Sequence, residues 1–162
     1  VTQFLTFRLS DSLPDEALLK IRHATHPESR RDEMLDRGLG ACWLRQDRIA
    51  QVVEQAFFAF DGMRYRLHAW TVMPNHVHVL ITVLPGFPLG SIVSSWKRYT
   101  ARLANKLLGR ASAFWQDDYW DRFIRNDEHF AATVAYIDLN PVKAGLIGSA
   151  GLWPWGRARL SL

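Results

Sequence analysis

Hydrophobic and polar residues alternate along three stretches of the chain, residues 3–9, 64–72 and 76–83. A period of two is typical of strands that bury one face. The turn signal Asp61-Gly62 precedes the second stretch, and only Met73-Pro74-Asn75 separates the second from the third. Two strands joined by so short a connection must be antiparallel neighbours.

Four other stretches have the spacing or composition of helices, and they span residues 15–37, 43–60, 90–108 and 127–140. Pro27 interrupts the first, because the residue before a proline avoids helical backbone angles. Gly109 marks the end of the third helix, and Asn126 caps the start of the fourth. Pro141 is expected to end or kink the fourth helix. A further strand is expected towards the end of residues 114–125.

The predicted order is strand, helices, strand, strand, helix, strand, helix, which is an α+β plan. We expect an antiparallel sheet with helices packed on one face and the other face left open. The chain has 162 residues, of which 48% are hydrophobic. This length suits a single domain over residues 1–162, with a sizeable core.

The strand over residues 76–83 has two distinct faces, because successive side chains on a strand point to opposite sides. His76 and His78 share one face, whereas Val77, Val79 and Ile81 share the other. The aliphatic face should bury against helices, which places the histidines on the open face. The two imidazoles lie roughly 7 Å apart along the strand, so both can reach one metal ion. The alternative is a pair of hydrogen-bonded polar residues on a strand.

Two histidines leave the coordination shell of a metal incomplete. An open position is what a catalytic metal needs, and histidine suits several transition metals better than it suits magnesium. On the predicted helix over residues 127–140, Tyr136 and Asn140 are four residues apart and therefore share a face. Asn140 offers a neutral oxygen as a third ligand. Tyr136 is a candidate nucleophile, but spacing alone does not select it over the other tyrosines, Tyr65, Tyr99 and Tyr119.

The net charge of the chain says little about which kind of partner it binds. There are 20 Lys and Arg against 16 Asp and Glu, which gives a net charge of +4 and a pI of about 9.6. This is compatible with a nucleic-acid partner and equally with an ordinary globular protein. The single cysteine, Cys42, excludes an internal disulfide and a cysteine-rich zinc site. No apolar run reaches the roughly 18 residues of a membrane helix, and we expect no leader and a cytoplasmic location.

Basic residues recur on the helix over residues 90–108 and again before the last helix. They are Lys97, Arg98, Arg102 and Lys106 on the helix, and Arg122 and Arg125 further along. Such a stripe can contact DNA phosphates, and the alternative is a solvated helix face. Trp70 and Trp120 are candidates for stacking on unpaired bases, with a core role as the alternative.

Two segments of this chain resemble those of a known family. Residues 73–78, Met-Pro-Asn-His-Val-His, look like the histidine–hydrophobic–histidine motif of the single-tyrosine transposases. Residues 136–146, from Tyr136 to Leu146, look like the tyrosine segment of the REP-associated tyrosine transposases. Residues 6–9 and 114–125 also resemble that group, so the similarity extends over nearly the whole chain. The tail departs from the family, because Trp153-Pro154-Trp155-Gly156-Arg157 stands where relatives have a Trp-x-Trp-Ser-Ser-like segment.

The resemblance implies a ferredoxin-like, RRM-like fold with the active site on the open face of the sheet. It implies that His76 and His78 bind Mg²⁺ or Mn²⁺, with Asn140 completing the metal shell. It also implies that Tyr136 attacks a DNA phosphate and forms a 5′-phosphotyrosine link. The substrate would be single-stranded DNA beside a palindromic hairpin, cleaved by a monomer or a homodimer.

Two other functions remain open from the sequence. The chain could be a hairpin-binding protein without catalysis, or a metal-dependent phosphodiesterase that uses water as its nucleophile. The first predicts binding without cleavage, and the second predicts cleavage without a covalent adduct. Sequence does not decide whether Tyr136 meets the histidines of its own chain or those of a partner.

Overall fold

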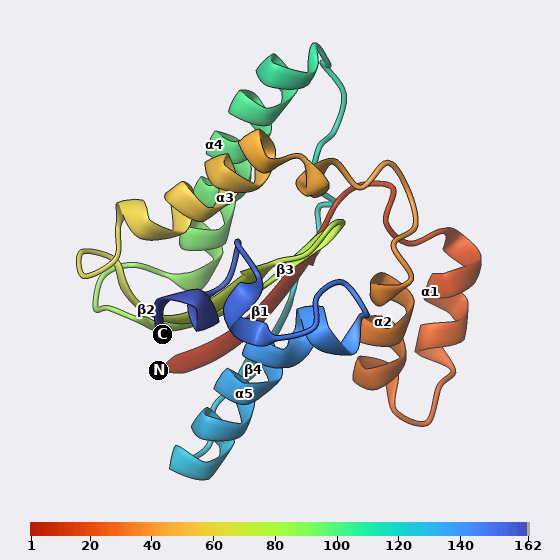
Figure 1. Ribbon diagram of the computed structural model, residues 1–162. Helices are drawn as coiled ribbons and strands as arrows, with labels where there is room; N and C mark the ends of the chain where they lie inside the picture. Colours follow the sequence, from red (N-terminus) through yellow and green to blue (C-terminus); the bar gives the residue numbers. More distant parts are fainter. Residues whose placement is uncertain (162) are drawn as a thin grey trace.

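The computed structural model describes residues 1–161 and shows one sheet with helices on both of its faces (Figure 1). The strands are β1 (Thr2–Arg8), β2 (Tyr65–Val72), β3 (His76–Val83) and β4 (Trp120–Phe123). They pair antiparallel in the order β2-β3-β1-β4. The α-helices are α1 (Asp15–Arg22), α2 (Pro27–Asp36), α3 (Asp47–Ala59), α4 (Leu89–Leu108) and α5 (Asp127–Lys143), and the short 3₁₀ helices are η1 (Trp43–Arg45), η2 (Ala150–Leu152) and η3 (Arg157–Ser161).

This architecture confirms the predicted α+β plan. The path β1-α3-β2-β3-α4-β4 is that of a ferredoxin-like fold, with α1 and α2 inserted after β1 and α5 added after β4. Within residues 1–161, no helix is both long enough and apolar enough to cross a membrane.

One face of the sheet forms the main hydrophobic core. Val77, Val79 and Ile81 of β3 are fully buried there, as the alternation predicted. Helices α3 and α4 cover this face, and they contribute Ile49, Val53, Phe57, Ile92 and Trp96 to the same core. This packing sets the position of β3, so it determines where the histidines on the other side lie.

The opposite face is not open, and the expectation of an exposed histidine face was wrong. Helix α5 crosses it, and the side chains of His76 and His78 are both 0% exposed. Ile137 of α5 packs with Phe4 and Leu80 of the sheet in a small second core. Alternation identified the aliphatic face correctly, but it could not show that this mixed face also carries enough apolar residues to bury a helix.

Two helix boundaries differ from the sequence expectation. The predicted helix over 43–60 is divided into η1 and α3. Helix α5 does not end at Pro141 but continues to Lys143, and Ala144 N still donates to Asn140 O at 2.9 Å. The proline removes one amide donor within the last turn, where the helix is about to end, so its cost is small. The cap at Asn126 is confirmed, since its side chain accepts from His129 N.

The C-terminal segment is attached to the edge of the sheet at β2. Val72 N donates to Trp155 O at 2.9 Å. Arg159 forms an ion pair with the buried carboxylate of Glu54, which also accepts from Trp70 Nε1 at 2.8 Å. Trp70 is 5% exposed and belongs to the core, so it offers no stacking surface.

Candidate active site

The two histidines lie in the middle of the sheet, beneath helix α5. His78 is paired across the strands with Thr71 of β2 and with Thr6 of β1, and Thr6 in turn faces Trp120 of β4. These four residues form one row on the face that α5 covers. The rings of His76 and His78 meet edge to face, with centroids 4.9 Å apart. Both side chains therefore point towards the same small volume.

The Nδ1 atom of each histidine already has a partner. His76 Nδ1 lies 2.8 Å from Asn75 Oδ1, and Asn75 Nδ2 donates to Leu39 O at 3.2 Å. Because Asn75 Oδ1 can only accept, His76 Nδ1 must carry the proton, and this leaves a lone pair on His76 Nε2. His78 Nδ1 lies 2.8 Å from Thr6 Oγ1. Such partners orient histidines that bind metals through the other nitrogen.

The Nε2 atoms face polar groups that are not satisfied. Among residues 1–161, no hydrogen-bond partner exists for His76 Nε2, His78 Nε2 or the side-chain oxygen and nitrogen of Asn140, although all are buried. Asn140 lies close enough to His76 to raise the pKa of His76, although the two side chains do not have the geometry of a hydrogen bond. Buried polar atoms nearly always have partners, so a cluster of four without any points to a bound ion or ligand. The described residues contain no group of three His, Cys, Asp or Glu placed to hold a metal, so a metal here would need the Asn140 oxygen.

Burial keeps both imidazoles neutral. It lowers the pKa of His76 well below the ordinary value and lowers the pKa of His78 to about 4. The neighbouring His78 and Arg31 lower the pKa of His76 further. At neutral pH His76 Nε2 therefore offers a lone pair to a cation, and His78 Nε2 does the same in the tautomer whose Nδ1 donates to Thr6 Oγ1.

Tyr136 lies directly against this histidine pair. Its ring meets His78 edge to face, with centroids 5.8 Å apart, and meets Phe4 in the same way at 6.0 Å. Its hydroxyl donates a hydrogen bond to Asp32 Oδ2, and Asp32 Oδ1 accepts from Arg31 Nε at 3.0 Å. Burial, followed by the Asp32 charge, raises the pKa of Tyr136 above its ordinary value. The hydroxyl is therefore protonated, and its hydrogen points at a carboxylate.

The other tyrosines are accounted for by packing. Tyr65 is buried and donates to Phe57 O at 2.6 Å. Tyr119 packs against the main core, and Tyr99 is 45% exposed on α4. Tyr136 is thus the tyrosine that lies at the histidines, and it meets the histidines of its own chain.

Sequence reasoning missed the acidic residues that α2 brings to the site. Asp32 is 6% exposed and bonds Tyr136, and Asp36 Oδ1 lies 3.8 Å from His76 Nε2. Burial, reinforced by the charge of Asp32, raises the pKa of Asp36 to about 7. The signal was present, because two acidic residues four apart on a helix share one face. The sequence did not indicate that this face would turn towards the sheet.

The predicted basic residues do not gather at the histidines. Arg98, Arg102 and Lys106 are exposed on α4, which packs on the opposite face of the sheet. Lys97 is half-buried, and its ammonium group donates to the carbonyls of Gln116 and Asp118 at 2.7 Å each. Arg122 lies on β4 and pairs with Glu28 of α2 at 2.5 Å, and Arg125 is exposed just after that strand.

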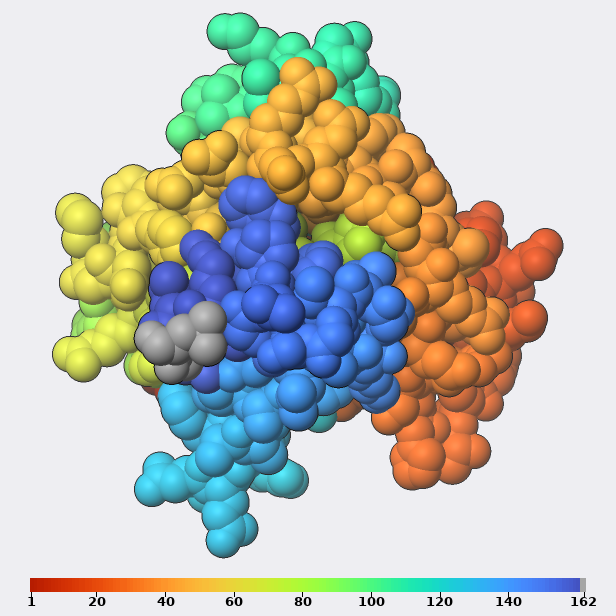
Figure 2. Space-filling model, viewed as in Figure 1, coloured from red at the N-terminus to blue at the C-terminus, as the bar shows by residue number. Residues whose placement is uncertain are grey.

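A hollow lies beside the turn that precedes His76. Figure 2 shows it between the C-terminal segment in dark blue and the segment before α3 in orange, with yellow-green atoms from the β2–β3 region at its base. The hollow corresponds to a cavity of about 300 Å³ that Leu44, Pro74, Trp153 and Trp155 help to line. The tail therefore forms one wall of a recess next to the histidine strand.

Comparison with known proteins assigns a family to this fold and to its buried arrangement of two histidines, a tyrosine and an asparagine. Residues 43–140 match the family described as transposase IS200-like, and the chain belongs to that family. A REP-associated tyrosine transposase from Escherichia coli K12 is 29% identical over 91 residues, which cover 56% of this chain and 53% of that protein. A relative from Haemophilus influenzae is 28% identical over 94 residues, covering 52% and 53%.

The chain spans about half the length of these curated relatives. A solved structure of a REP-associated tyrosine transposase bound to a REP hairpin matches 98% of this chain and 77% of that protein, with a TM-score of 0.64 and 22% identity. At this identity the match establishes the fold alone. It agrees with the ferredoxin-like plan expected from the sequence.

Proposed function

We propose that this chain is a metal-dependent endonuclease and strand transferase. It would act on single-stranded DNA beside a hairpin, through a 5′-phosphotyrosine intermediate. The observation that carries the proposal is the contact between Tyr136 and His78 within one chain, with the tyrosine hydroxyl bonded to Asp32. Family membership supports the same activity, as does the hairpin in the solved structure of the similar protein.

The residues at the site fit a divalent cation. His76 Nε2, His78 Nε2 and Asn140 Oδ1 are buried together without partners among residues 1–161, and they would supply two nitrogen ligands and one oxygen ligand. Mn²⁺ accepts such a mixed set readily, and Mg²⁺ does so less readily because it prefers oxygen. When bound, the ion would polarise the oxygens of a DNA phosphate. Asp36, whose Oδ1 lies 3.8 Å from His76 Nε2, would accept hydrogen bonds from water molecules bound to the ion.

The chain itself provides both the nucleophile and the group that accepts its proton. Tyr136 Oη attacks phosphorus, and its proton passes to Asp32 Oδ2, which already accepts its hydrogen bond. The new bond joins the tyrosine oxygen to phosphorus, and the bond from phosphorus to the 3′-oxygen breaks. The 3′-oxygen takes a proton from water and leaves as a 3′-hydroxyl. Arg31 orients the Asp32 carboxylate for this role.

A direct test uses a hairpin with single-stranded flanks, Mn²⁺ and a denaturing gel that separates covalent adducts. Wild-type protein should form an adduct, and Tyr136→Phe should form none. Tyr99→Phe is the matched control, because Tyr99 is exposed on α4, and it should behave as wild type. Cleavage without an adduct would support a water-using phosphodiesterase, and tight binding without cleavage would support a binding protein.

The same assay can test the role of Asp32 and whether Tyr136 acts with the histidines of its own chain. Asp32→Asn keeps the shape of the side chain but removes the proton acceptor, so adduct formation should slow by about 10²-fold or more. Because Tyr136 meets the histidines of its own chain, a mixture of Tyr136→Phe and His76→Ala proteins should stay inactive. Restored activity in that mixture would mean that the tyrosine acts on a partner subunit.

A further inference from the structure

The proposed metal ligands are completely enclosed, although the proposed reaction requires a DNA phosphate to reach them. His76 and His78 are both 0% exposed, and Asn140 is 1% exposed. Helix α5 covers His78 with the ring of Tyr136. Helix α2 covers His76 with Asp36, whose Oδ1 lies 3.8 Å from the Nε2 atom of that histidine. One of these covering elements must therefore move before DNA can enter.

The two covering elements are attached to the sheet in different ways. Helix α5 is held by apolar contacts, because Ile137 packs with Phe4 and Leu80 of the sheet. Helices α1 and α2, together with the residues just before them, form a unit over residues 13–36. This α1–α2 unit has an apolar cluster of its own, made of Leu13, Ala17, Ile21, Met34 and Leu35. Within residues 1–161, no residue of the unit belongs to the apolar clusters on the two faces of the sheet. Elements that bury few apolar contacts against their neighbours open most easily, so the α1–α2 unit is the element that moves.

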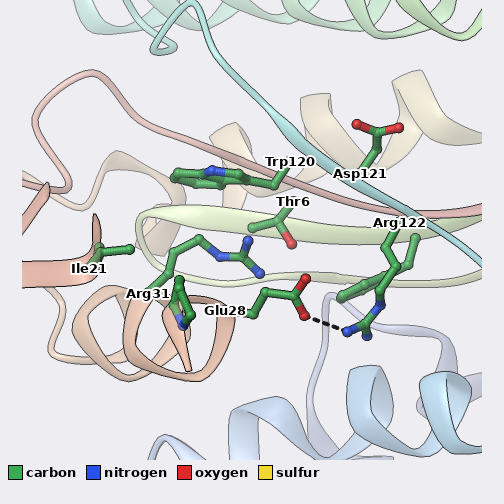
Figure 3. A pocket seen from close by; sticks show the side chains of 9 residues that line it. Thr6, Ile21, Glu28, Arg31, Trp120, Asp121 and Arg122 are labelled. Carbon is green, nitrogen blue, oxygen red and sulfur yellow. Dashed lines mark hydrogen bonds and ion pairs between the residues drawn. The ribbon is translucent and has the colours of Figure 1, made fainter. Parts of the chain in front are cut away.

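The boundary between this unit and the sheet consists mainly of charged groups. Figure 3 shows it from close by, with Glu28 and Arg31 of α2 facing Trp120 and Arg122 of β4. Glu28 pairs with Arg122 at 2.5 Å, and these side chains are 58% and 44% exposed. The Arg31 guanidinium lies over the Trp120 ring, 4.7 Å from its centre, and Trp120 also packs against the apolar cluster of the unit. A cavity of about 150 Å³ remains between the two sides. Because exposed ion pairs contribute little and the boundary is not closely packed, the two sides can separate readily.

The α1–α2 unit leaves the rest of the protein and returns to it at one anchored point. Asp11 Oδ2 accepts a hydrogen bond from Ala41 N at 2.9 Å, which links the two ends of the unit. Leu39 O accepts from Asn75 Nδ2 at 3.2 Å, which links the returning end to the residue before β3. Gly38 lies between α2 and these links, and its φ is +71°. Glycine adopts such angles without steric cost and can absorb a change of backbone direction, so the anchored ends and Gly38 form a hinge.

We propose that the α1–α2 unit is a lid that moves away from β4 to admit the DNA strand and then closes over the bound phosphate. The proposal rests on the proposed function and adds an access step to it. Closure would return Asp32 to the Tyr136 hydroxyl, because these two groups are hydrogen-bonded in the closed form. Closure would also exclude water from the tyrosine, which favours the covalent link over hydrolysis. The lid would thus carry the proton acceptor of the reaction into place.

Chemical modification of the histidines tests the lid without DNA or metal. Diethyl pyrocarbonate modifies neutral imidazoles that solvent can reach, and mass spectrometry measures the rate at each histidine separately. The enclosed His76 should react only through the open form, whereas His23 is exposed and should react directly. Glu28→Gln removes the ion pair across the boundary, so the rate at His76 should rise by about 1.5- to 5-fold, the usual effect of an exposed pair. Glu33→Gln is the matched control, because it removes an exposed pair with Arg30 inside the unit and should leave that rate unchanged. An equal rise in the two variants would contradict the proposal.

A reversible crosslink across the boundary gives a stronger test. In a protein with Glu28→Cys and Arg122→Cys, a bis-methanethiosulfonate linker would join α2 to β4, and the native Cys42 is buried. We expect the crosslink to slow modification of His76 by about 10-fold or more, because it removes the open form. A reductant should restore the rate, and the rate at His23 should not change. An unchanged rate at His76 in the crosslinked protein would overturn the proposal, and Glu28→Gln remains as a test if the cysteine variant fails to fold.

A second crosslink distinguishes the lid from movement of α5. Asp138 of α5 pairs with Arg157 of the C-terminal segment, so cysteines at these two positions allow the same linker to hold α5 in place. This crosslink should leave modification of His76 unchanged. If it slows the modification while the crosslink between α2 and β4 does not, the movement belongs to α5 and the proposal is wrong.

The protein crosslinked between α2 and β4 also separates the lid from the proposed cleavage. With Mn²⁺ and a hairpin that carries single-stranded flanks, the crosslinked protein should form no covalent adduct until a reductant is added. Adduct formation at the full rate while the crosslink is intact would overturn the lid. If wild-type protein forms no adduct either, the proposed function fails, and the modification rates of His76 still decide whether the lid opens.

Discussion

The two faces of the sheet are both buried, but they are closed in different ways. Under α3 and α4, side chains such as Val77, Val79 and Phe57 form a continuous apolar core. Under α5, the small apolar cluster around Leu80 lies beside His76 and other buried polar atoms that have no partners among residues 1–161. One face is organised for stability, and the other keeps polar groups in a state that costs stability.

This difference indicates where the function of the molecule lies. An unsatisfied buried polar group costs about 1–3 kcal/mol, and a protein rarely retains several together without a use for them. The apolar core on the far side supplies the stability that the histidine face lacks. It also holds β3 rigidly, and a rigid strand keeps the two histidines in position.

The largest effect is expected from truncation on the apolar face. Phe57→Ala should destabilise the protein by about 3–5 kcal/mol, because Phe57 is 1% exposed and its ring contacts Phe7 and Trp96. Urea denaturation would measure this loss. Leu139→Ala, at a side chain that is 53% exposed on α5, is the control and should change stability by less than about 0.5 kcal/mol. A loss at Phe57 no larger than the loss at Leu139 would mean that Phe57 does not stabilise the apolar core.

Metal binding should stabilise the histidine face selectively. At a Mn²⁺ concentration 100-fold above its dissociation constant, the gain is about 2.7 kcal/mol, or about 5–10 °C in Tm for a chain of this size. A thermal scan with and without Mn²⁺, and with a chelator, would measure it. The shift should disappear in His76→Ala and persist in His23→Ala, since His23 is exposed on the surface. A shift that survives in His76→Ala would place the ion elsewhere.

A matched pair of asparagine substitutions should move stability in opposite directions. Asn140→Leu removes two buried atoms that have no partner within residues 1–161, so the metal-free protein should gain about 1–2 kcal/mol. Asn75→Leu should lose stability, because the Asn75 amide binds both Leu39 O and His76 Nδ1. Denaturation without metal would compare them. Destabilisation by Asn140→Leu would show that Asn140 has a structural role rather than a ligand role.

The smallest effect concerns the basic stripe on α4, beyond the apolar face. We propose that Arg98, Arg102 and Lys106 contact phosphates of the hairpin, and each lost contact would reduce the slope of log affinity against log salt by about 0.9. Binding of a labelled hairpin over a salt series would measure this in the triple alanine variant. An unchanged slope would restrict DNA binding to the histidine face and its margins. Arg48→Ala, on α3, is a suitable control for the loss of an exposed charge.

The local properties of each segment could be derived from the sequence. The hairpin of β2 and β3 follows from their alternation and from the three-residue connection between them, and the shared face of His76 and His78 follows from the pleat. Tyr136 was a different case, because its spacing to Asn140 defines a helix face but not what that face meets. Resemblance to a family singled it out where the local pattern could not.

The meeting of distant segments was decided by the tertiary structure. Asp32 is 104 residues from Tyr136 in the chain, and their hydrogen bond depends on how α2 docks beside the sheet. The covering of the histidine face by α5 depends in the same way on contacts among Ile137, Leu80 and Phe4. Periodicity reports which side of an element is apolar, because it is a property of neighbouring residues. It carries no information about which partner buries that side, because such contacts arise from the packing of the whole chain.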